Sequence, residues 1–331
     1  MTAEVPIIDL RSFTDGTTGD RRRIAAEIDS ACRSIGFLVV SGHGVPGRLL
    51  HQMHDASTDF FSLPKETKRN LQVATNDDIG YKSYGSSYLT NTLGSDLKEG
   101  AVADWKESFG ARPMPPLSRM SVEEKPYFAL ELWPASLPHM RPIYTAYFSQ
   151  MVRLSETLME AFAIGLGLDE GYFRGMIDRH LSVLAVHHYP AQPTPPKPGQ
   201  MRAGAHTDFG SLTILHTGDN PRGLQVRHHD EWIDVVPEWD HFVVNIGDLM
   251  AQWTNDRWLS TLHRVVNPSP DRSQLSRQSL TFFHSPNWHA SVECIPTCSG
   301  PDRPAKYAPV TSGAYTEEKL AKLRDSAQTQ S

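Results

Sequence analysis

The sequence predicts a mainly β fold with flanking helices, in which a helix-rich N-terminal half supports a sandwich or barrel of short strands. Helical periodicity dominates before residue 170, and short β-rich segments separated by turns recur from 183 to 296. No internal repeat or low-complexity linker divides the chain. We therefore expect one domain over residues 1–331, with a helix-rich region at about 1–170, a β core at about 180–300 and a tail at 301–331.

The N-terminal elements follow from hydrophobic patterning. We expect strands at 5–10 and 36–46 and helices at 21–34, 47–61 and about 140–166. In the longest helix, Met151, Leu154, Leu158 and Phe162 share one face. Residues 75–100 are polar and rich in Gly, Ser and Asn, so they predict a long loop.

The C-terminal half carries the β signal. Predicted strands cover 183–189, 211–215, 223–226, 231–236, 241–247, 260–266, 277–283 and 291–296. The proline-rich segment 191–200 cannot enter a sheet interior. Residues 316–326 predict a closing helix, which could pack over the barrel or on a partner.

Composition limits the possible partners and location. The chain of 331 residues has a formal net charge of -6 and no Lys/Arg cluster typical of a nucleic-acid surface. It has no apolar run long enough to span a membrane, and its start, MTAEVPIIDL, does not read as a signal peptide. Three cysteines do not make a disulfide framework. We expect a cytoplasmic protein that binds a small molecule; the sequence does not indicate an oligomeric state.

Two histidines and one aspartate form a candidate metal site. On a strand, residues i and i+2 point to one side, so His206 and Asp208 would present an imidazole and a carboxylate together. His263, on a predicted strand, is a candidate third ligand, although a packed core histidine is an alternative. Such a set is typical of non-haem Fe(II) oxygenases, but zinc hydrolases use it too. A second His-x-Asp, His228 to Asp230, lies in a polar turn and predicts an exposed hairpin.

A candidate carboxylate receptor follows beyond the third histidine. Arg277 and Ser279 would share one face of a strand, and Tyr189 could add a third donor. A guanidinium beside a hydroxyl offers a fork of donors that matches a carboxylate. The alternative is an outward-facing arginine on an edge strand.

These patterns together resemble the isopenicillin N synthase-like branch of the Fe(II)/2-oxoglutarate-dependent dioxygenases. The C-terminal match comprises HTDFGSLTIL at 206–215, GLQV at 223–226, Trp232, NIGDL at 245–249, WTN at 253–255, HRV at 263–265 and RQS at 277–279. The N-terminal match comprises PIIDL at 6–10, GFLVVSGHGV at 36–45, FFSLP at 60–64 and WKE at 105–107. The resemblance covers about 5 to 300.

The resemblance implies a double-stranded β-helix (jelly roll) with Fe(II) on His206, Asp208 and His263. It implies that Arg277 and Ser279 hold the distal carboxylate of 2-oxoglutarate. Tyr189 matches the tyrosine of the family's N-x-Y-P segment, in which His187 replaces the asparagine. Asn245 and Asp248 would shape the turn near the metal.

The implied activity is oxidation of an unactivated C–H bond of a small metabolite, by hydroxylation, desaturation or ring closure. 2-Oxoglutarate and O2 would become succinate and CO2, and specialised metabolism is the common setting. An oxidase of the isopenicillin N synthase kind is the nearer alternative, because it uses a similar Arg/Ser pair for a substrate carboxylate without 2-oxoglutarate. A zinc-bound, non-redox module is a further alternative.

Two other motifs indicate different classes of enzyme. GHGVPG at 42–47 satisfies the dinucleotide pattern G-x-G-x-x-G of nicotinamide-dependent dehydrogenases, but no βαβαβ series or closing acidic residue follows. DFG at 208–210 lacks the preceding H-R-D motif of kinases. We expect neither activity.

Substrate-side residues are predicted by position alone, and each aromatic could equally be core. The candidates are Tyr81, Tyr84, Phe109, His187, Leu212 and Phe283. The segments 80–98 and 191–200 are candidate lids.

Overall fold

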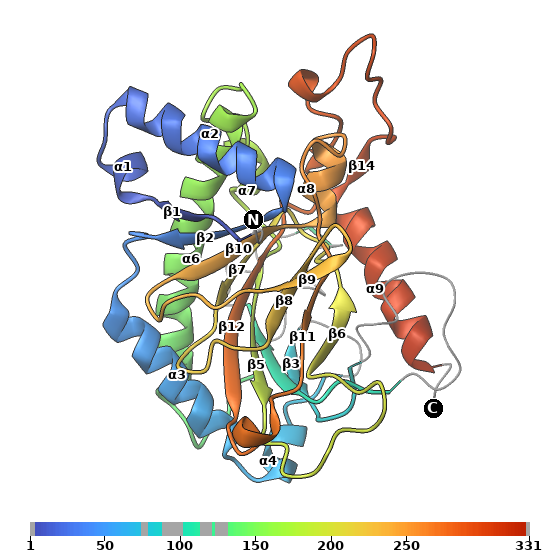
Figure 1. The fold of residues 1–331 in the computed structure, drawn as a ribbon. Helices are drawn as coiled ribbons and strands as arrows, with labels where there is room; N and C mark the ends of the chain where they lie inside the picture. The colour runs from blue at the N-terminus through green and yellow to red at the C-terminus, as the bar shows by residue number, and fades with distance from the viewer. Residues whose placement is uncertain (1–3, 74–78, 88–101, 113–120, 123–131, 329–331) are drawn as a thin grey trace.

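A computed structural model describes residues 4–73, 79–87, 102–112, 121–122 and 132–328 (Figure 1). Within them, eight strands form a large sheet and four form a small one. In spatial order the large sheet holds β1 (Ile7–Asp9), β2 (Phe37–Ser41), β10 (Phe242–Ile246), β7 (Leu212–His216), β12 (Arg277–His284), β5 (Val183–Tyr189), β4 (Glu107–Ala111) and β3 (Gly80–Lys82). The small sheet holds β6 (Ala203–His206), β11 (His263–Val265), β8 (Leu224–His228) and β9 (Glu231–Asp234). A separate pair is β13 (Ser291–Val292) with β14 (Val310–Thr311).

The chain alternates between the two sheets, and this alternation makes the jelly roll. From β5 to β12 it passes from large to small sheet and back several times, with antiparallel pairing throughout. The inner faces pack on one another, with Phe37, Val39 and Val243 of the large sheet against Leu224 and Val226 of the small one. The predicted double-stranded β-helix is confirmed.

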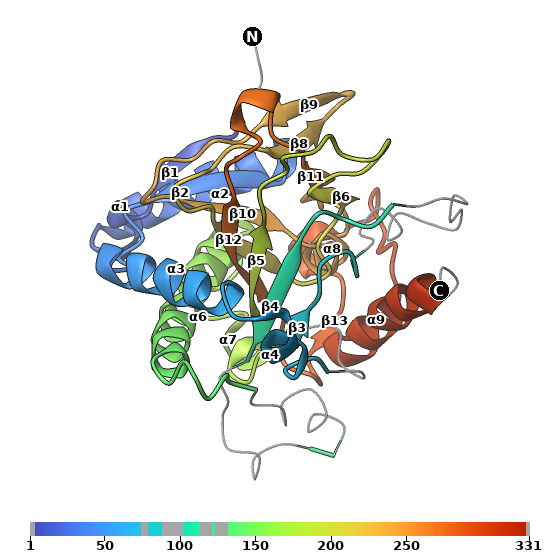
Figure 2. The ribbon, with the colours of Figure 1, turned by 90° about the horizontal axis from the view of Figure 1, so that it is seen from below.

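Helices cover the outer face of the large sheet, as Figures 1 and 2 show. These are α2 (Thr18–Ser34), α3 (Gly47–Phe61) and α6 (Met140–Gly165). The four predicted apolar residues of α6 are all buried. Helix α2 begins earlier than predicted because Thr17 and Asp20 form a capping box. The remaining helices of the described residues are α1 (Arg11–Thr14), α4 (Lys65–Arg69), α7 (Arg174–Ile177), α8 (Asp248–Trp253), α9 (Ser312–Gln328) and the 3₁₀ turns η3 (Pro270–Arg272) and η4 (Pro296–Cys298).

Several sequence predictions need correction. The loop predicted at 75–100 is wrong at Gly80–Lys82, which forms β3; residues 74–78 and 88–101 lie outside the described residues. Strands β4 and β6 were not predicted, because ESFGA and AGAH carry too few apolar residues for a period-two signal. The strand predicted at 260–266 is shorter and begins at His263, and the one at 291–296 ends at Val292.

The dinucleotide-like stretch 42–47 is the turn between β2 and α3. Gly42 and Gly44 have positive φ, which suits a tight turn rather than a phosphate loop. Strand β2 pairs in parallel only with β1 and is antiparallel to β10, so a parallel βαβαβ series is absent from the described residues. Among the described helices, none is both long and apolar enough to cross a bilayer.

A buried ion pair anchors β4 on its helical side. Glu107 accepts hydrogen bonds from Lys68 at 2.8 Å and Tyr81 at 2.6 Å, and contacts His188 Nδ1 at 2.8 Å. Burial raises the pKa of Glu107, but these partners outweigh burial and lower it to about 2. The neighbouring residues of β4 therefore face the opposite side of the sheet.

We predict that Glu107→Gln lowers the free energy of unfolding by about 3 kcal/mol at pH 7, because the Lys68 charge stays buried without its counter-ion. Since the folded carboxyl has the lower pKa, its stabilisation is present above the ordinary value of 4.5 and is lost as the pH falls toward about 2. Denaturant unfolding of both proteins across this range should show the difference shrinking. An unchanged difference at low pH would contradict the electrostatic origin.

Candidate active site

Three side chains meet between the sheets at one end of the barrel. His206 ends β6 and pairs across the ladder with His263, the first residue of β11. Asp208 Oδ1 lies 3.9 Å from His206 Nε2 and 3.7 Å from His263 Nε2. The sequence prediction that one strand carries both His206 and Asp208 is wrong, because β6 ends at His206. The turn after the strand brings the carboxylate to the same place.

Hydrogen bonds hold each of the three groups in the orientation that a metal requires. Asp208 Oδ2 accepts from Thr213 Oγ1 at 2.6 Å and from Asn245 Nδ2 at 2.8 Å, which leaves Oδ1 toward the histidines. The Nδ1 atoms of His206 and His263 lie 2.8 and 3.1 Å from backbone carbonyls. Donation from Nδ1 leaves both Nε2 lone pairs available for a metal.

The protonation states also suit a cation. Burial and the neighbouring His263 lower the pKa of His206. Burial raises the pKa of Asp208. His263, His206 and the two hydrogen bonds to the carboxylate lower this pKa by more than burial raises it, so it lies below its ordinary value. Two imidazoles and one carboxylate are the donor set of a 2-His-1-carboxylate iron site.

A small cavity of about 50 Å³ leads from these residues to Arg277. Arg277 is 2% exposed, and Nε, Nη1 and Nη2 have no hydrogen-bond partner in the described part of the chain. Ser279 lies two residues on along β12 and lines the same cavity. Tyr189 is the cross-strand neighbour of Arg277, whose Cζ lies 5.0 Å from its ring centroid. Strand β12 lies inside the sheet, so the edge-strand alternative for Arg277 is wrong.

A buried guanidinium without partners is costly unless a ligand supplies the acceptors. The small size of the cavity and the hydroxyls in its wall fit the distal carboxylate of 2-oxoglutarate.

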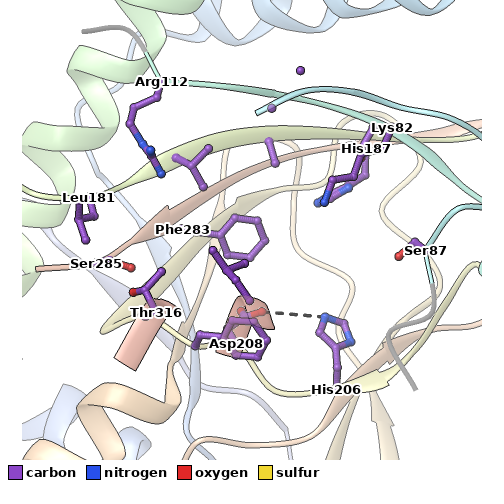
Figure 3. A pocket seen from close by; sticks show the side chains of 18 of the residues that line it. Lys82, Ser87, Arg112, Leu181, His187, His206, Asp208, Phe283, Ser285 and Thr316 are labelled. Carbon is purple, nitrogen blue, oxygen red and sulfur yellow. Dashed lines mark ion pairs between the residues drawn. The ribbon is translucent and has the colours of Figure 1, made fainter. Parts of the chain in front are cut away.

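A second cavity of about 200 Å³ opens on the other side of the triad (Figure 3). Lys106, His187, His206, Asp208 and Phe283 line both cavities, so the two are continuous. The walls come from alternate residues of three strands and from the last helix. They include Lys106, Ser108, Gly110 and Arg112 along β4, Leu181, Val183, Ala185 and His187 along β5, Phe283 and Ser285 at the end of β12, and Thr316 and Leu320 of α9.

The structure divides the six predicted substrate residues into two groups. His187 and Phe283 line the larger cavity. Tyr81, Phe109 and Leu212 point to the other face of the large sheet and lie in the helix-side core, where Phe109 packs on Phe60 with ring centroids 4.5 Å apart.

Tyr84 is 38% exposed and packs edge-on against Trp105. It does not line the larger cavity formed by the described residues. The alternation of side chains along a strand explains why Tyr81 on β3, Phe109 on β4 and Leu212 on β7 face the helices rather than the cavity.

The cavity also contains residues that the sequence reasoning missed. Lys82, Lys106 and Arg112 face it from β3 and the two ends of β4. The alternation of 106, 108, 110 and 112 would have indicated them if β4 had been recognised. Burial, followed by Lys106 and Lys82, holds the pKa of the neighbouring His187 well below its ordinary value.

Helix α9 contributes Thr316 and Leu320 to the wall of the larger cavity, and its Lys319 donates to Asp248 at 2.8 Å. Of the two candidate lids, Ser87 in the first segment lines the cavity, residues 88–98 lie outside the described residues, and 191–200 contribute no lining residue.

Comparisons with known proteins agree with this geometry. The profile of the 2OG-Fe(II) oxygenase superfamily matches residues 180–286, and that of the non-haem dioxygenase in morphine synthesis N-terminal region matches 5–136. Validamycin A dioxygenase of Streptomyces hygroscopicus subsp. limoneus is 34% identical over 86% of this chain and 77% of the relative. The chain belongs to the 2OG-Fe(II) oxygenase superfamily.

Two further similarities cover nearly the whole chain of this oxygenase. A 2-oxoglutarate-Fe(II) type oxidoreductase, hxnY, of Emericella nidulans is 31% identical over 94% of this chain and 89% of the relative. A full-length Neurospora crassa protein, crystallised in complex with α-ketoglutarate and thymine, superposes with a TM-score of 0.84 at 31% identity and covers 96% of both chains. The enzyme is thus a 2-oxoglutarate- and Fe(II)-dependent dioxygenase. This family membership confirms the predicted Fe(II), 2-oxoglutarate and O2 and excludes the dehydrogenase; the isopenicillin N synthase-like branch stays a prediction.

We predict that Asn245→Ala weakens Fe(II) binding by about 10- to 100-fold, because Asp208 loses a hydrogen bond that orients its carboxylate. Titration of the apo-protein with Fe(II) or Co(II), followed by absorption, measures the affinity. The exposed Asn70→Ala is the matched control and should bind metal like the unaltered protein. Equal affinity of both variants would show that Thr213 alone orients Asp208.

Proposed function

We propose that His206, Asp208 and His263 hold Fe(II), and that Arg277, Ser279 and Tyr189 bind the distal carboxylate of 2-oxoglutarate. The unpartnered guanidinium of Arg277 carries this proposal, since it is buried beside a cavity whose walls include all three candidate metal ligands. Charge-assisted donors at that depth fix the far end of a five-carbon diacid and direct its keto-acid end toward the triad.

Bound Fe(II), 2-oxoglutarate and O2 supply an oxidant that attacks an unactivated C–H bond, with succinate and CO2 as co-products. The residues of the chain would position the bound ligands and exclude water from the site. Thr213 and Asn245 hold the carboxylate of Asp208, and Phe283 and His187 stand where the two cavities meet. A substrate in the larger cavity would present its C–H bond beside the triad and be hydroxylated; desaturation or ring closure would follow from a different placement of the same carbon.

The relatives support a small-molecule substrate and a role in specialised metabolism, since one is named for validamycin A and another was solved with thymine. The cavity of about 200 Å³ also suits a small metabolite. The whole chain would act as one catalytic domain, because one core cluster joins residues of α2 and α6 with residues of β5 and β12. A cytoplasmic location agrees with the three free cysteines.

We predict iron-dependent formation of succinate from 2-oxoglutarate by the purified protein with Fe(II), ascorbate and O2. His206→Ala should abolish it, because a ligand is lost, and Zn(II) in place of Fe(II) should not support it. Arg277→Leu should raise the KM for 2-oxoglutarate by about 10- to 100-fold, the worth of a hydrogen bond to a charged group. Arg48→Leu, on the exposed side of α3, is the matched control.

Binding of 2-oxoglutarate to the Fe(II) protein under argon separates the remaining alternatives. Binding without succinate would indicate strict coupling to an absent substrate. Tight Fe(II) binding without 2-oxoglutarate binding would favour an oxidase of the isopenicillin N synthase kind and would overturn the proposed role of Arg277.

A further inference from the structure

Lys106 is a buried cation that is neither a candidate metal ligand nor paired with another side chain. The residue is 7% exposed, and its side chain makes no hydrogen bond or ion pair with the other described residues. Burial of an ammonium group without an acceptor costs free energy, and buried polar groups in native proteins almost always have a partner. An unpaired lysine in the wall of a cavity therefore indicates a ligand that brings the acceptor.

Hydrogen bonds connect the backbone at Lys106 to the strand that carries His206. The Lys106 N–H donates to the Asp104 carbonyl at 3.0 Å, and the Asp104 carboxylate accepts from the Gly204 N–H at 2.9 Å. The Gly204 carbonyl lies 2.8 Å from His206 Nδ1. Because Glu107 points to the helix side of β4, the preceding residue, Lys106, points to the cavity side. Lys106 is thus held in a fixed place relative to the candidate metal ligand.

The lining of the two cavities shows which end of the co-substrate Lys106 would meet. Arg277 and Ser279 line only the smaller cavity. Lys106 lines both cavities, as do His206 and Asp208. A co-substrate whose distal carboxylate is bound by Arg277 has its keto-acid end beside the candidate metal ligands. Lys106 therefore lies at the keto-acid end rather than at the distal end.

The charge of Lys106 acts on two imidazole rings at this junction. Burial has the largest effect on the pKa of His187 and of His206 and lowers both, and the Lys106 charge lowers each of them further. Figure 3 shows His187 and His206 at the same end of the larger cavity, away from Arg112. The ammonium group therefore lies near both rings, where the two cavities meet.

The protein itself offers Lys106 no anion at this place. Among the described residues that line the two cavities, Asp208 is the one carboxylate. One of its oxygens accepts from Thr213 and Asn245, and the other lies toward the two candidate histidine ligands. The acceptor for Lys106 must therefore come from a ligand. The keto-acid carboxylate is the anion that the proposed function already brings beside the triad.

We propose that Lys106 binds the carboxylate at the keto-acid end of 2-oxoglutarate, so that a cation of the protein holds each end of the co-substrate. This inference rests on the proposed function and adds a binding residue to the same site. Arg277 and Lys106 together select a diacid, because a monoacid leaves one buried cation without an acceptor. Lys106 also positions the keto-acid end beside the triad, since its backbone is tied to the strand of His206.

The test compares two analogues of 2-oxoglutarate that each lack one carboxylate. Levulinate has a methyl group in place of the keto-acid carboxylate, and 2-oxopentanoate has a methyl group in place of the distal carboxylate. Calorimetric competition against 2-oxoglutarate, with the Fe(II) protein under argon, measures the dissociation constants. Lys106→Met should weaken binding of 2-oxoglutarate and 2-oxopentanoate by about 10- to 100-fold and leave levulinate unchanged, because levulinate lacks the group that Lys106 binds.

Variants of both cations serve as matched controls. Arg277→Leu should give the reciprocal result, with weaker binding of 2-oxoglutarate and levulinate and unchanged binding of 2-oxopentanoate. Lys106→Arg retains the charge and should recover part of the affinity for 2-oxopentanoate. Lys197→Met, on an exposed loop, should behave like the unaltered protein. Titration of each variant with Fe(II) separates loss of ligand binding from loss of the metal.

The outcomes separate this inference from the proposed function. Unchanged binding of 2-oxopentanoate in Lys106→Met, or equal weakening of levulinate and 2-oxopentanoate, would overturn the role of Lys106. Lys106→Gln, which keeps a polar side chain without the charge, should repeat the pattern of Lys106→Met, and a different pattern would also overturn it. Retained binding of levulinate shows that the variants are folded. Unchanged binding of levulinate in Arg277→Leu would instead reject the proposed function.

Discussion

Side-chain alternation along β4, β5 and β12 is the constraint on which the rest of this site depends. Each strand has one set of residues in the helix-side core and the other set in the cavities. Glu107 and Phe109 therefore fix β4 against Lys68, Tyr81 and the helices, and Ser108 and Gly110 are thereby turned toward the substrate side. A one-residue slip would exchange the two sets and place the anchoring carboxylate in the cavity.

The buried charged side chains differ in whether they have a protein partner. Glu107 and Asp208 are satisfied by named protein donors, so both carboxylates stay ionised and fixed. Arg277 has no such partner among the described residues, although it is fully enclosed and burial lowers its pKa. An enclosed cation is tolerable in the working enzyme if a ligand brings the opposite charge, so the apo state carries a desolvation cost that binding removes. Stability and co-substrate binding are thereby linked.

The residues of the candidate metal and co-substrate sites could be predicted from the sequence, whereas most residues that line the larger cavity could not. The spacing of His206, Asp208, His263 and Arg277 identified the family, although β6, which ends at His206, was not predicted as a strand and Asp208 lies in the turn that follows it. Strand β4 escaped prediction because ESFGA mixes a charge, a hydroxyl and a glycine, and with it Lys106 and Arg112 were missed. Phe109 and Leu212 were assigned to the pocket because composition does not reveal which face of a strand is inward. The place of α9 depends on a long-range contact, Lys319 to Asp248, that no local pattern encodes.

Two cavities with shared walls raise the question of how the enzyme keeps its two ligands apart. The pocket at Arg277 is small, and the guanidinium nitrogens have no hydrogen-bond partner among the described residues, so the pocket favours a slender diacid. The larger cavity measures about 200 Å³ and includes Gly80, Gly110 and Ala185, which leave room above the sheet, so it favours a bulkier body. His187 and Phe283 stand where the cavities meet, and a substrate seated there would cover the entrance to the inner pocket. The difference in cavity size and the shared entrance would therefore favour binding of the co-substrate first and of the substrate second.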